Sequence, residues 1–572
     1  MTPGSGLCPS YTVSRAVLSD AVALVRGDRF YTTSFHPKAL TSWGYAEQGS
    51  DLTIDNGCVF YKLFLRAFPN NFEPESVYVH YPLTVPEEMT RVLKKLRKAH
   101  LYSFKRPGNL VIPKLITSYA TAAQVIDNHD VFKVTWGKAM EFLMGPRAKT
   151  FMLSGDEPAN FKSRKLMEQS LYLNGSSRAI PKGNEKWLQE VRAFYEKKTL
   201  ELLKQKQYKL AGTNYVDLMR DVVNPAQVHF CAEVFSLPLK MEKTPHGIFD
   251  EQKFYLMMAA VFTCIFFDVD PPHSFPLRLK AREATQLLGK LLEAEVTVFK
   301  TTGSFTKSFL KMLKVEDTDS TLKSYGFHMI EQLLKTGIDV KDLVWGNVLA
   351  TAGGMVANQG QVLGQALEYF LTKGVEHLPA INALAKQNTP EAEEKLMRYF
   401  WEASRLYGET GMFRDVAADI TITDQGREMR LKKGDRLMVN LRAASHDPLV
   451  FPDPERFNPD RPLEKYIHLG WGQHQCIGLP MCLVGLSAML KVIGRLDNLR
   501  LAPAWNGLRD GGDGGGGVSK LRKVAKSFDP DGGPDGMPES WHYHMYLRGD
   551  EQGEGYFPFP TSLKVCWDGE LA

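Results

Sequence analysis

The pattern of apolar and polar positions predicts a chain built mostly of helices. Residues 344–371 and 389–406 each place apolar side chains on one face, which predicts two helices of 28 and 18 residues. Residues 254–267 form the longest apolar run, which is too short to span a bilayer and therefore predicts a helix of the core. Residues 419–440 alternate with the period of a β-strand. The predicted fold class is mainly α with small β-sheets.

Changes in composition divide the chain into two domains. A basic linker follows the first domain, which we assign to residues 1–92, and the second domain is expected over residues 93–572. The Gly/Asp-rich run at residues 510–517 predicts a flexible surface insertion. Near the end of the chain, residues 541–547 and 563–567 are predicted to pair as a closing hairpin.

Composition and charge exclude several classes of protein. The 70 basic residues nearly balance the 65 acidic ones, so nothing indicates a nucleic-acid partner. Seven cysteines are scattered, odd in number and without metal-binding spacing, which is typical of a reduced intracellular protein. No signal peptide or membrane anchor is recognised, so a cytoplasmic location is expected, with peripheral contact to membranes or lipid bodies as a further option.

The most informative segment is the run Leu-Gly-Trp-Gly-Gln-His-Gln-Cys-Ile-Gly at residues 469–478. Gly472 and Gly478 lie four residues before and two after Cys476, where they permit a tight bend and a close approach to a flat cofactor. His474 could meet a carboxylate of that cofactor. The apolar stretch that follows predicts a helix whose N-terminal dipole favours a thiolate. A buried core cysteine in a turn is the alternative interpretation.

This loop resembles the cysteine loop of cytochrome P-450 proteins, in which the sulfur is the axial ligand of haem iron. Leu469 departs from the family pattern, which usually has Phe at that place. The resemblance implies a cytochrome P-450 fold that binds haem b through the thiolate of Cys476. Arg164 and Arg414 are candidates for contacts with the haem propionates, although a solvated arginine explains each of them as well.

Two further motifs follow in the order of that family. Glu402 and Arg405 form a Glu-x-x-Arg pair on one helix face, and residues 454–457 read Pro-Glu-Arg-Phe. By resemblance, Glu402, Arg405 and Arg456 form a charge-linked structural triad behind the cysteine loop. A solvated helix salt bridge would explain each pair taken singly.

The helix predicted at residues 344–371 lacks the usual proton relay of oxygen-activating cytochrome P-450 proteins. That relay is an acid followed by Thr, whereas residues 355–361 contain neither. Asn358 and Gln361 lie three residues apart and share a helix face, while Gln359 points elsewhere. Carboxamides exchange hydrogen bonds without titrating, which suits a substrate that already carries its oxygen, such as a hydroperoxide. A polar helix face or a contact between helices is the alternative.

The run Ala-Asn-Gln-Gly-Gln at residues 357–361 is similar to the signature of fungal linoleate diol synthases, also called psi-factor-producing oxygenases. Those proteins join a haem peroxidase-like fatty-acid dioxygenase to a C-terminal cytochrome P-450 domain. The resemblance implies that Asn358 and Gln361 are catalytic and handle a linoleate-type hydroperoxide, with Cys476 on iron. The product would be a dihydroxy fatty acid, an oxylipin, formed without NADPH or a reductase. An allene oxide synthase, an ordinary monooxygenase and a non-catalytic remnant are the alternatives.

The start of the chain supports the same family. Residues 11–31 look like the closing helix of the dioxygenase domain, so residues 1–92 are expected to be its short helical remnant. The first ninety residues offer only His36 and His80, without the catalytic His and Tyr set of a working dioxygenase. We therefore expect the C-terminal part of a longer fusion, or a truncated gene model. Its expected partners are a fatty-acid hydroperoxide and the upstream dioxygenase domain of a full-length protein, with no nucleic acid.

Overall fold

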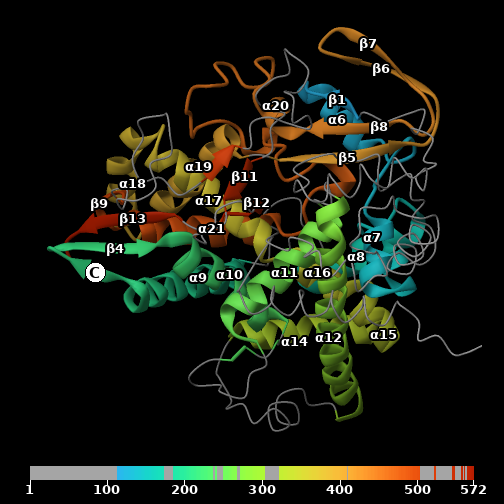
Figure 1. The fold of residues 1–572 in the computed structure, drawn as a ribbon, viewed down its shortest axis with the longest axis horizontal. Helices are drawn as coiled ribbons and strands as arrows, with labels where there is room; N and C mark the ends of the chain where they lie inside the picture. Colours follow the sequence, from blue (N-terminus) through green and yellow to red (C-terminus); the bar gives the residue numbers. More distant parts are fainter. Residues whose placement is uncertain are drawn as a thin grey trace, which may run out of the picture.

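The computed structural model confirms a mainly α fold with small sheets (Figure 1). It describes residues 113–172, 185–235, 249–266, 271–302, 321–408 and 410–502, with short stretches from 237 to 240 and from 521 to 571. The predictions for residues 1–92 and 510–517 lie outside the described residues. The α-helices are α6 (Tyr119–Asp127), α7 (Gly137–Met144), α8 (Pro158–Leu171), α9 (Glu185–Lys206), α10 (Asn224–Val234), α11 (Glu251–Phe266), α12 (Pro271–Thr302), α14 (Thr321–Lys335), α15 (Val340–Leu343), α16 (Leu349–Gly353), α17 (Ala357–Leu371), α18 (Leu378–Ala385), α19 (Pro390–Tyr407), α20 (Leu441–Ser445) and α21 (Leu479–Gly494).

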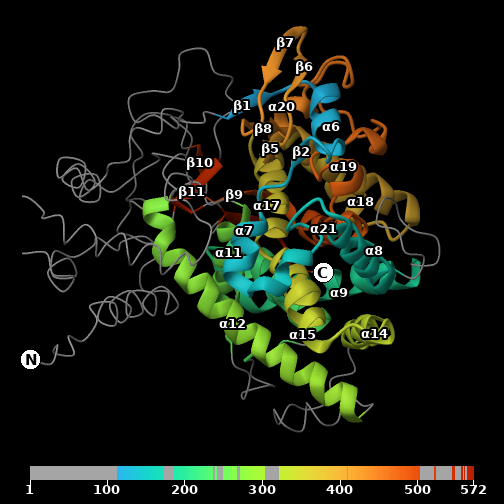
Figure 2. The same cartoon turned by 90° about the vertical axis from the view of Figure 1, so that its right-hand side faces the viewer.

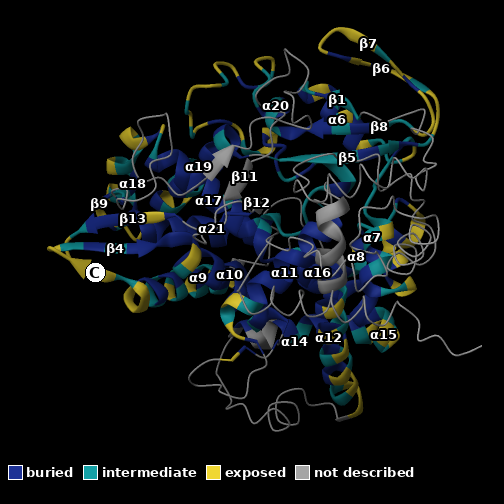
Figure 3. Cartoon of the chain, in the orientation of Figure 1, coloured by how far each residue is buried: buried dark blue, intermediate teal, exposed yellow. Residues whose placement is uncertain are grey.

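The centre of the molecule is a group of packed helices, α9, α10, α17, α19 and α21 (Figures 1 and 2). Helix α21 is buried on all sides from Pro480 to Gly494, because its sequence is apolar except for Ser487 and for Lys491, which pairs with Glu196 and Glu393. Burial is concentrated where these helices meet, whereas exposed residues lie at the periphery (Figure 3). The predicted core helix is confirmed as α11, of which twelve of the sixteen residues are buried. None of the helices in the described ranges is long and apolar enough to cross a bilayer.

Helix α19 confirms the prediction for residues 389–406. The Thr389 hydroxyl accepts a hydrogen bond of 3.2 Å from the Ala392 N–H, and Pro390 occupies the first helical position. Both features favour a helix start, because the cap satisfies a free donor and proline has none to lose. The helix therefore presents Glu402 and Arg405 on its buried face near its C-terminal end.

The single helix predicted at residues 344–371 is wrong, because the structure interrupts it. A π-helical turn, η3 (Val344–Val348), and α16 precede a break at residues 354–356, after which α17 begins. Within the break, the Gly354 N–H donates to the Thr351 carbonyl at 3.1 Å, three residues back instead of four. Adjacent glycines weaken the helix here. Helix α11 also packs against the break, since a Cβ on Gly353 would lie 3.3 Å from Val261 Cγ1. Asn358 thus falls in the first turn of a new helix.

Within the described ranges, four small sheets complete the fold. The first has the order β1-β8-β5-β2, in which β1 pairs with β8 in parallel and the other pairs are antiparallel. A separate hairpin, β6–β7, turns at Gln425 and Gly426, which both have positive φ. Strands β6, β7 and β8 confirm the strands predicted over residues 419–440. The strands are β1 (Lys114–Ile116), β2 (Phe132–Lys133), β3 (Tyr208–Leu210), β4 (Thr213–Asp217), β5 (Gly411–Val416), β6 (Ile420–Asp424), β7 (Arg427–Leu431), β8 (Arg436–Asn440), β9 (Asp497–Leu501), β10 (Leu521–Lys523), β11 (His544–Leu547), β12 (Tyr556–Phe557) and β13 (Lys564–Asp568).

The closing hairpin predicted from residues 541–547 and 563–567 is wrong. Strand β13 pairs with β4 and β9, whereas β11 pairs with β10 and β12. Three consecutive residues of β13, Val565, Cys566 and Trp567, are buried, as expected for an inner strand. Alternation identifies a strand but not its neighbours, and β4 lies more than 300 residues earlier in the chain.

Candidate functional site

The cysteine loop folds as its sequence predicts. It begins with a turn at Gly470, whose φ is +82°, and passes through a single 3-10 turn, η6 (Gly472–His474). The Cys476 N–H donates to the carbonyl of Leu469 at 2.8 Å, which closes the loop. Helix α21 follows directly, so the cysteine lies just before a helix N-terminus.

The surroundings of the Cys476 sulfur have opposite effects on its pKa. Burial raises the pKa of the Cys476 thiol, while the backbone N–H groups of Gly478 and Leu479 and the charge of Arg164 act to lower it. Such donors stabilise a thiolate. The site therefore contains the anion-stabilising groups that a metal-bound sulfur needs.

The two predicted glycines serve the loop in different ways. Gly472 has a φ of +57°, and a Cβ there would lie 1.9 Å from Asp127 Oδ1, so glycine is required for the loop to fold against α6. Gly478 has a φ of −81°, and a Cβ there would only touch the sulfur atoms of Cys476 and Cys482, at 3.6 and 3.8 Å. Contact of either glycine with a cofactor stays a prediction.

His474 is buried and paired with a carboxylate that sequence reasoning missed. Its Nε2 lies 2.6 Å from Oδ1 of Asp156, and the Val134 N–H donates to the other oxygen at 2.7 Å. Burial lowers the pKa of His474 and Asp156 opposes that change. Burial acts to raise the pKa of Asp156, but the hydrogen bonds from His474 and Val134 outweigh that effect, so the pKa is lowered overall. Asp156 is 318 residues from His474 in the chain and belongs to no recognisable motif. The contact predicted between His474 and a cofactor carboxylate stays a prediction.

Arg414, on β5, is the clearest test of whether a haem fits this site. Its guanidinium is fully buried 5.3 Å from the ring of Trp136, yet its Nε and Nη2 meet no acceptor among the described residues. Burial lowers the pKa of Arg414 to about 10, which corresponds to about 3 kcal/mol relative to water. Buried cations are normally paired. A haem propionate has the charge and acceptors that this guanidinium lacks, so the residues present fit a haem.

Arg164 lies on α8 and is also buried. Its Nη2 forms an ion pair of 3.0 Å with Oε1 of Glu168, one turn along the helix. Its charge acts on both Cys476 and His474, and the charge of Arg414 acts on His474 as well. The structure therefore brings the predicted cations and the cysteine into one electrostatic cluster, although the propionate contact of Arg164 stays a prediction.

Replacing Arg414 with leucine should have opposite effects on the apoprotein and on cofactor binding. Without the unpaired buried charge, the apoprotein should unfold at a higher temperature. Haem should bind at least tenfold more weakly, because its propionate loses the guanidinium. Arg430→Leu is the control, since that arginine is 85% exposed on β7. Haem titration and thermal unfolding measure the two effects, and unchanged haem affinity would remove Arg414 from the site.

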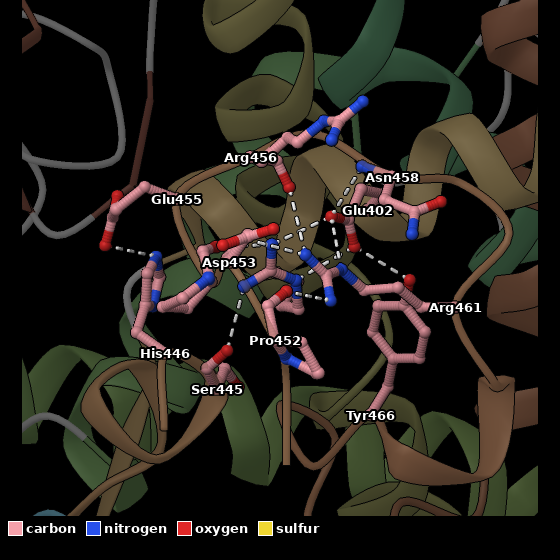
Figure 4. A network of polar contacts seen from close by, with 12 residues as sticks. Glu402, Ser445, His446, Pro452, Asp453, Glu455, Arg456, Asn458, Arg461 and Tyr466 are labelled. Carbon is pink, nitrogen blue, oxygen red and sulfur yellow. Dashed lines mark hydrogen bonds and ion pairs between the residues drawn. The ribbon is translucent and has the colours of Figure 1, made fainter. Parts of the chain in front are cut away.

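The predicted charge triad forms, but with a different third member (Figure 4). Arg405 donates from Nε and Nη2 to the two oxygens of Glu402, at 2.9 and 2.8 Å. The second arginine is Arg461, whose Nε donates to Glu402 Oε1 at 3.0 Å. Arg456 is exposed and contributes only its backbone carbonyl, which accepts from Arg461 at 3.1 Å. The assignment of Arg456 to the triad was therefore wrong.

The reason lies in how the loop turns between residues 452 and 461. Both Nη atoms of Arg461 donate to carbonyls of that loop, at Pro452, Asp453 and Arg456. One guanidinium thus holds the turn and reaches the carboxylate at the same time. Glu402 is fully buried, and its pKa is lowered because its hydrogen bonds outweigh the effect of burial.

This network also reaches toward the cysteine loop. The Tyr466 hydroxyl donates to Glu402 Oε2 at 2.8 Å, ten residues before the cysteine. The other side of Arg405 donates to the carbonyls of Ser445 and Pro454, at 2.9 and 2.7 Å. Helix α19, the turn after α20 and the segment leading to Cys476 are therefore held by one buried charged group. These contacts indicate that the charged group fixes the positions of these segments relative to one another.

The amides predicted to be catalytic lie in the first turns of α17. Asn358 Oδ1 is buried and meets no donor among the described residues. Gln361 is buried one turn further on. Gln359 points in a different direction, with its Oε1 3.3 Å from the Tyr195 hydroxyl, as the helix periodicity predicts. The catalytic role of the first two stays a prediction.

Comparisons with known proteins agree with this geometry. The family model described as Cytochrome P450 matches residues 396–501, from α19 through the cysteine loop to β9. Among solved structures, P450BioI in complex with an acyl carrier protein ligated to hexadec-9Z-enoic acid has a TM-score of 0.51. It is 16% identical, and the match covers 72% of this chain and 94% of that one. The cytochrome P-450 fold is therefore confirmed.

Sequence relatives decide the family. Psi-producing oxygenase A of Emericella nidulans is 47% identical, over 100% of this chain and 49% of that protein. Linoleate diol synthase of Gaeumannomyces graminis is 34% identical, over 99% of this chain and 53% of that protein. The chain belongs to the psi-producing oxygenase and linoleate diol synthase family. A bifunctional dioxygenase–epoxy alcohol synthase of Pyricularia oryzae is also similar, at 42% identity over 100% of this chain and 46% of that protein.

This member of the psi-producing oxygenase family spans about half the length of the curated relatives it matches. Its cytochrome P-450 fold implies haem with a thiolate ligand. The relatives' names cover more than one product class.

Proposed function

We propose that this chain is a haem-thiolate isomerase that converts a linoleate-type hydroperoxide to a dihydroxy fatty acid. The observation that carries the proposal is the pair of amides, Asn358 and Gln361, at the start of α17. They stand where oxygen-activating relatives of the fold have an acid and Thr, while Cys476 is retained. A site without a titratable relay suits a substrate that brings both of its oxygens.

Thiolate-ligated haem supplies the cleavage of an O–O bond. The residues of this chain position the reactants for it. Asn358 has a buried amide oxygen that meets no donor in the part of the chain that the structure describes, so it can accept a hydrogen bond from the hydroperoxide O–H, and its NH2 can donate to the departing oxygen. Neither exchange changes the charge of the amide. Because the product is an isomer of the substrate, neither NADPH nor a reductase is needed.

The proposed substrate also defines the proposed partners. A fatty-acid dioxygenase must form the hydroperoxide, and the upstream half of the full-length relatives is the natural source. Cys476 would hold the iron, and Arg414 would hold a propionate. The charged group around Glu402 would keep the loop that carries the cysteine in place.

The direct test is to incubate the purified, haem-loaded protein with linoleate hydroperoxides in the absence of air. Diol should form with a yield that does not depend on reductase or dioxygen. Hydroxylation only when reductase and dioxygen are supplied would instead identify a monooxygenase, and an allene oxide would identify a dehydratase.

A second product class is favoured by one observation. The relative that is 42% identical is named for epoxy alcohol synthesis, and an epoxy alcohol is also an isomer of the hydroperoxide. The same anaerobic incubation separates the two, because the diol carries two hydroxyls whereas the epoxy alcohol carries an epoxide and one hydroxyl. A dominant epoxy alcohol would move this chain to that class.

Asn358→Leu should retain the spectrum of a thiolate-ligated haem while lowering the rate of isomerisation about 100-fold, or redirecting the oxygen to another carbon. The physical reason is loss of the hydrogen bonds that steer the peroxide oxygens. Gln387→Leu, at an exposed position two residues after the end of α18, is the control for replacing an amide with an apolar group. Product analysis by chromatography measures the effect, and an unchanged product profile would exclude the amide role.

A further inference from the structure

A buried tyrosine hydroxyl joins four helices at the level of the predicted amides. Tyr195, on α9, is 1% exposed. Its hydroxyl lies 2.6 Å from Gln227 Oε1 of α10 and 3.3 Å from Gln359 Oε1 of α17. The Gln227 amide in turn donates to Met489 Sδ of α21 at 3.3 Å. A single polar chain therefore links α9, α10, α17 and α21.

The tyrosine ring fixes the hydroxyl with little freedom. A Cβ on Gly485 of α21 would lie 2.6 Å from Tyr195 Cε2, so glycine is needed for the ring to fit. On the other side, the ring of Phe230 of α10 lies 4.8 Å away between centroids. Helix α21 begins three residues after Cys476. The ring thus rests on the helix that extends from the cysteine loop.

Hydrogen-bonding groups in this apolar centre are better suited to fixing a geometry than to adding stability. Burial raises the pKa of Tyr195 well above its usual value, so it remains a neutral phenol. Its single hydrogen can serve the nearer acceptor, Gln227. A half-turn of the Gln359 amide would let its NH2 donate to the same hydroxyl oxygen. Each of these bonds is directional, and a neutral buried hydrogen bond adds only about 1 kcal/mol.

Gln359 is the neighbour of Asn358 in the helix, so the direction of the Gln359 side chain sets the direction of the Asn358 side chain. Successive residues of a helix point about 100° apart, and turning one turns the other. The break at residues 354–356 separates this turn from α16. At the start of α17, the Gly360 N–H reaches the carbonyl of the N-cap residue Val356 at 3.3 Å, a long hydrogen bond. The first turn of α17 therefore depends on its lateral contacts.

Those contacts lie on two sides of the turn. Asn224 of α10 packs directly on Gly360, where a Cβ would lie 2.4 Å from Asn224 Oδ1. Tyr195 holds Gln359. Among the hydrogen bonds of the described residues, the one to Tyr195 is the polar side-chain tie of this turn to the helix that follows Cys476, through Gln227 and Met489.

We propose that Tyr195 is a positioning residue, which holds the first turn of α17 so that the Asn358 amide is set at a fixed angle relative to the Cys476 helix. The inference rests on the proposed function, since it gives the Asn358 amide a substrate to orient. In this role Tyr195 acts through Gln359, which its hydroxyl contacts.

The test makes the same substitution, tyrosine to phenylalanine, at two buried positions. Tyr195→Phe removes the polar tie, whereas Tyr255→Phe, the control, alters a buried tyrosine of α11 whose hydroxyl meets no partner among the described residues. Both variants should retain the red-shifted carbon-monoxide band of a thiolate-ligated haem. In the Tyr195 variant, kcat should fall on the order of tenfold with KM changed less than twofold, since small misplacements lower rate more than binding.

A second readout does not depend on isomerase activity. With carbon monoxide bound to the reduced haem, the C–O stretching band senses the polar groups around it. Tyr195→Phe and Gln359→Leu should broaden or shift this band in the same direction as Asn358→Leu, and Tyr255→Phe should leave it unchanged. The double variant Tyr195→Phe/Gln359→Leu should be no more altered than either single one, because both remove the same tie.

An unchanged C–O band in the Tyr195 variant, or an equal change in the Tyr255 variant, would overturn the positioning role even if wild type forms diol. If wild type forms no diol, the proposed function fails, yet the C–O comparison still decides whether Tyr195 sets the Asn358 amide. An unshifted band in Asn358→Leu would overturn the positioning role as well.

Discussion

Replacing Cys476 with serine is expected to abolish both isomerisation and the red-shifted carbon-monoxide band of the haem. Serine keeps the shape of the loop, because the Cys476 N–H still bonds the Leu469 carbonyl and helix α21 still follows. It removes the soft, electron-donating sulfur. The thiolate supplies the electron density that favours O–O cleavage, so activity should fall by at least 1000-fold.

The matched control is Cys482→Ser, in the first turn of α21. Cys482 is a buried neighbour of Cys476, since a Cβ on Gly478 would lie within 4 Å of both sulfurs, but its sulfur lacks the donors and the Arg164 charge that act on Cys476. This variant should lose some stability but retain the thiolate band and diol formation. Carbon-monoxide difference spectra and product yield are measured on both. A thiolate band that survives in Cys476→Ser and disappears in Cys482→Ser would reverse the assignment of the ligand.

The second large expected effect is a loss of stability on replacing Arg461 but not on replacing Arg456, five residues earlier. Arg461→Leu should destabilise the protein by about 3 to 5 kcal/mol, because it removes a buried partner of Glu402 and the donor to the Pro452 and Arg456 carbonyls. Arg456→Leu should change stability by less than about 0.5 kcal/mol, since its side chain is exposed. The measurements are thermal unfolding and the haem content of the purified protein.

Haem content should follow stability in this comparison. The network around Glu402 holds the segment that leads through Tyr466 to Cys476, so the Arg461 variant should lose most of its haem. Arg461→Lys should lie between the two, because lysine keeps the charge but not the planar fork that reaches the carboxylate and the carbonyls together. Equal haem loss in the Arg456 variant would restore the triad that the sequence motif indicates.

Sequence motifs predicted the parts of the site that are local in the chain. The cysteine loop closes through a bond between Leu469 and Cys476, seven residues apart. The Glu402–Arg405 pair spans three residues of a helix, and the different directions of Asn358 and Gln359 follow from the helical period. Each depends on backbone geometry that a short stretch of sequence already dictates.

Packing between distant segments decided the rest. Asp156 meets His474 across 318 residues, and Arg461 displaces Arg456 because of how one loop turns against α19. Residues 344–371 are interrupted partly because α11 packs on Gly353.

The sequence by itself determined the fold class, the closed loop at Cys476 and the different directions of Asn358 and Gln359, because these follow from short-range patterns of residue type. Only the tertiary structure decided which buried guanidinium has nitrogens without an acceptor among the described residues, which arginine completes the charged group and which tyrosine contacts Gln359. Those outcomes depend on the charge and space that distant segments leave for one another, and no local pattern contains that information.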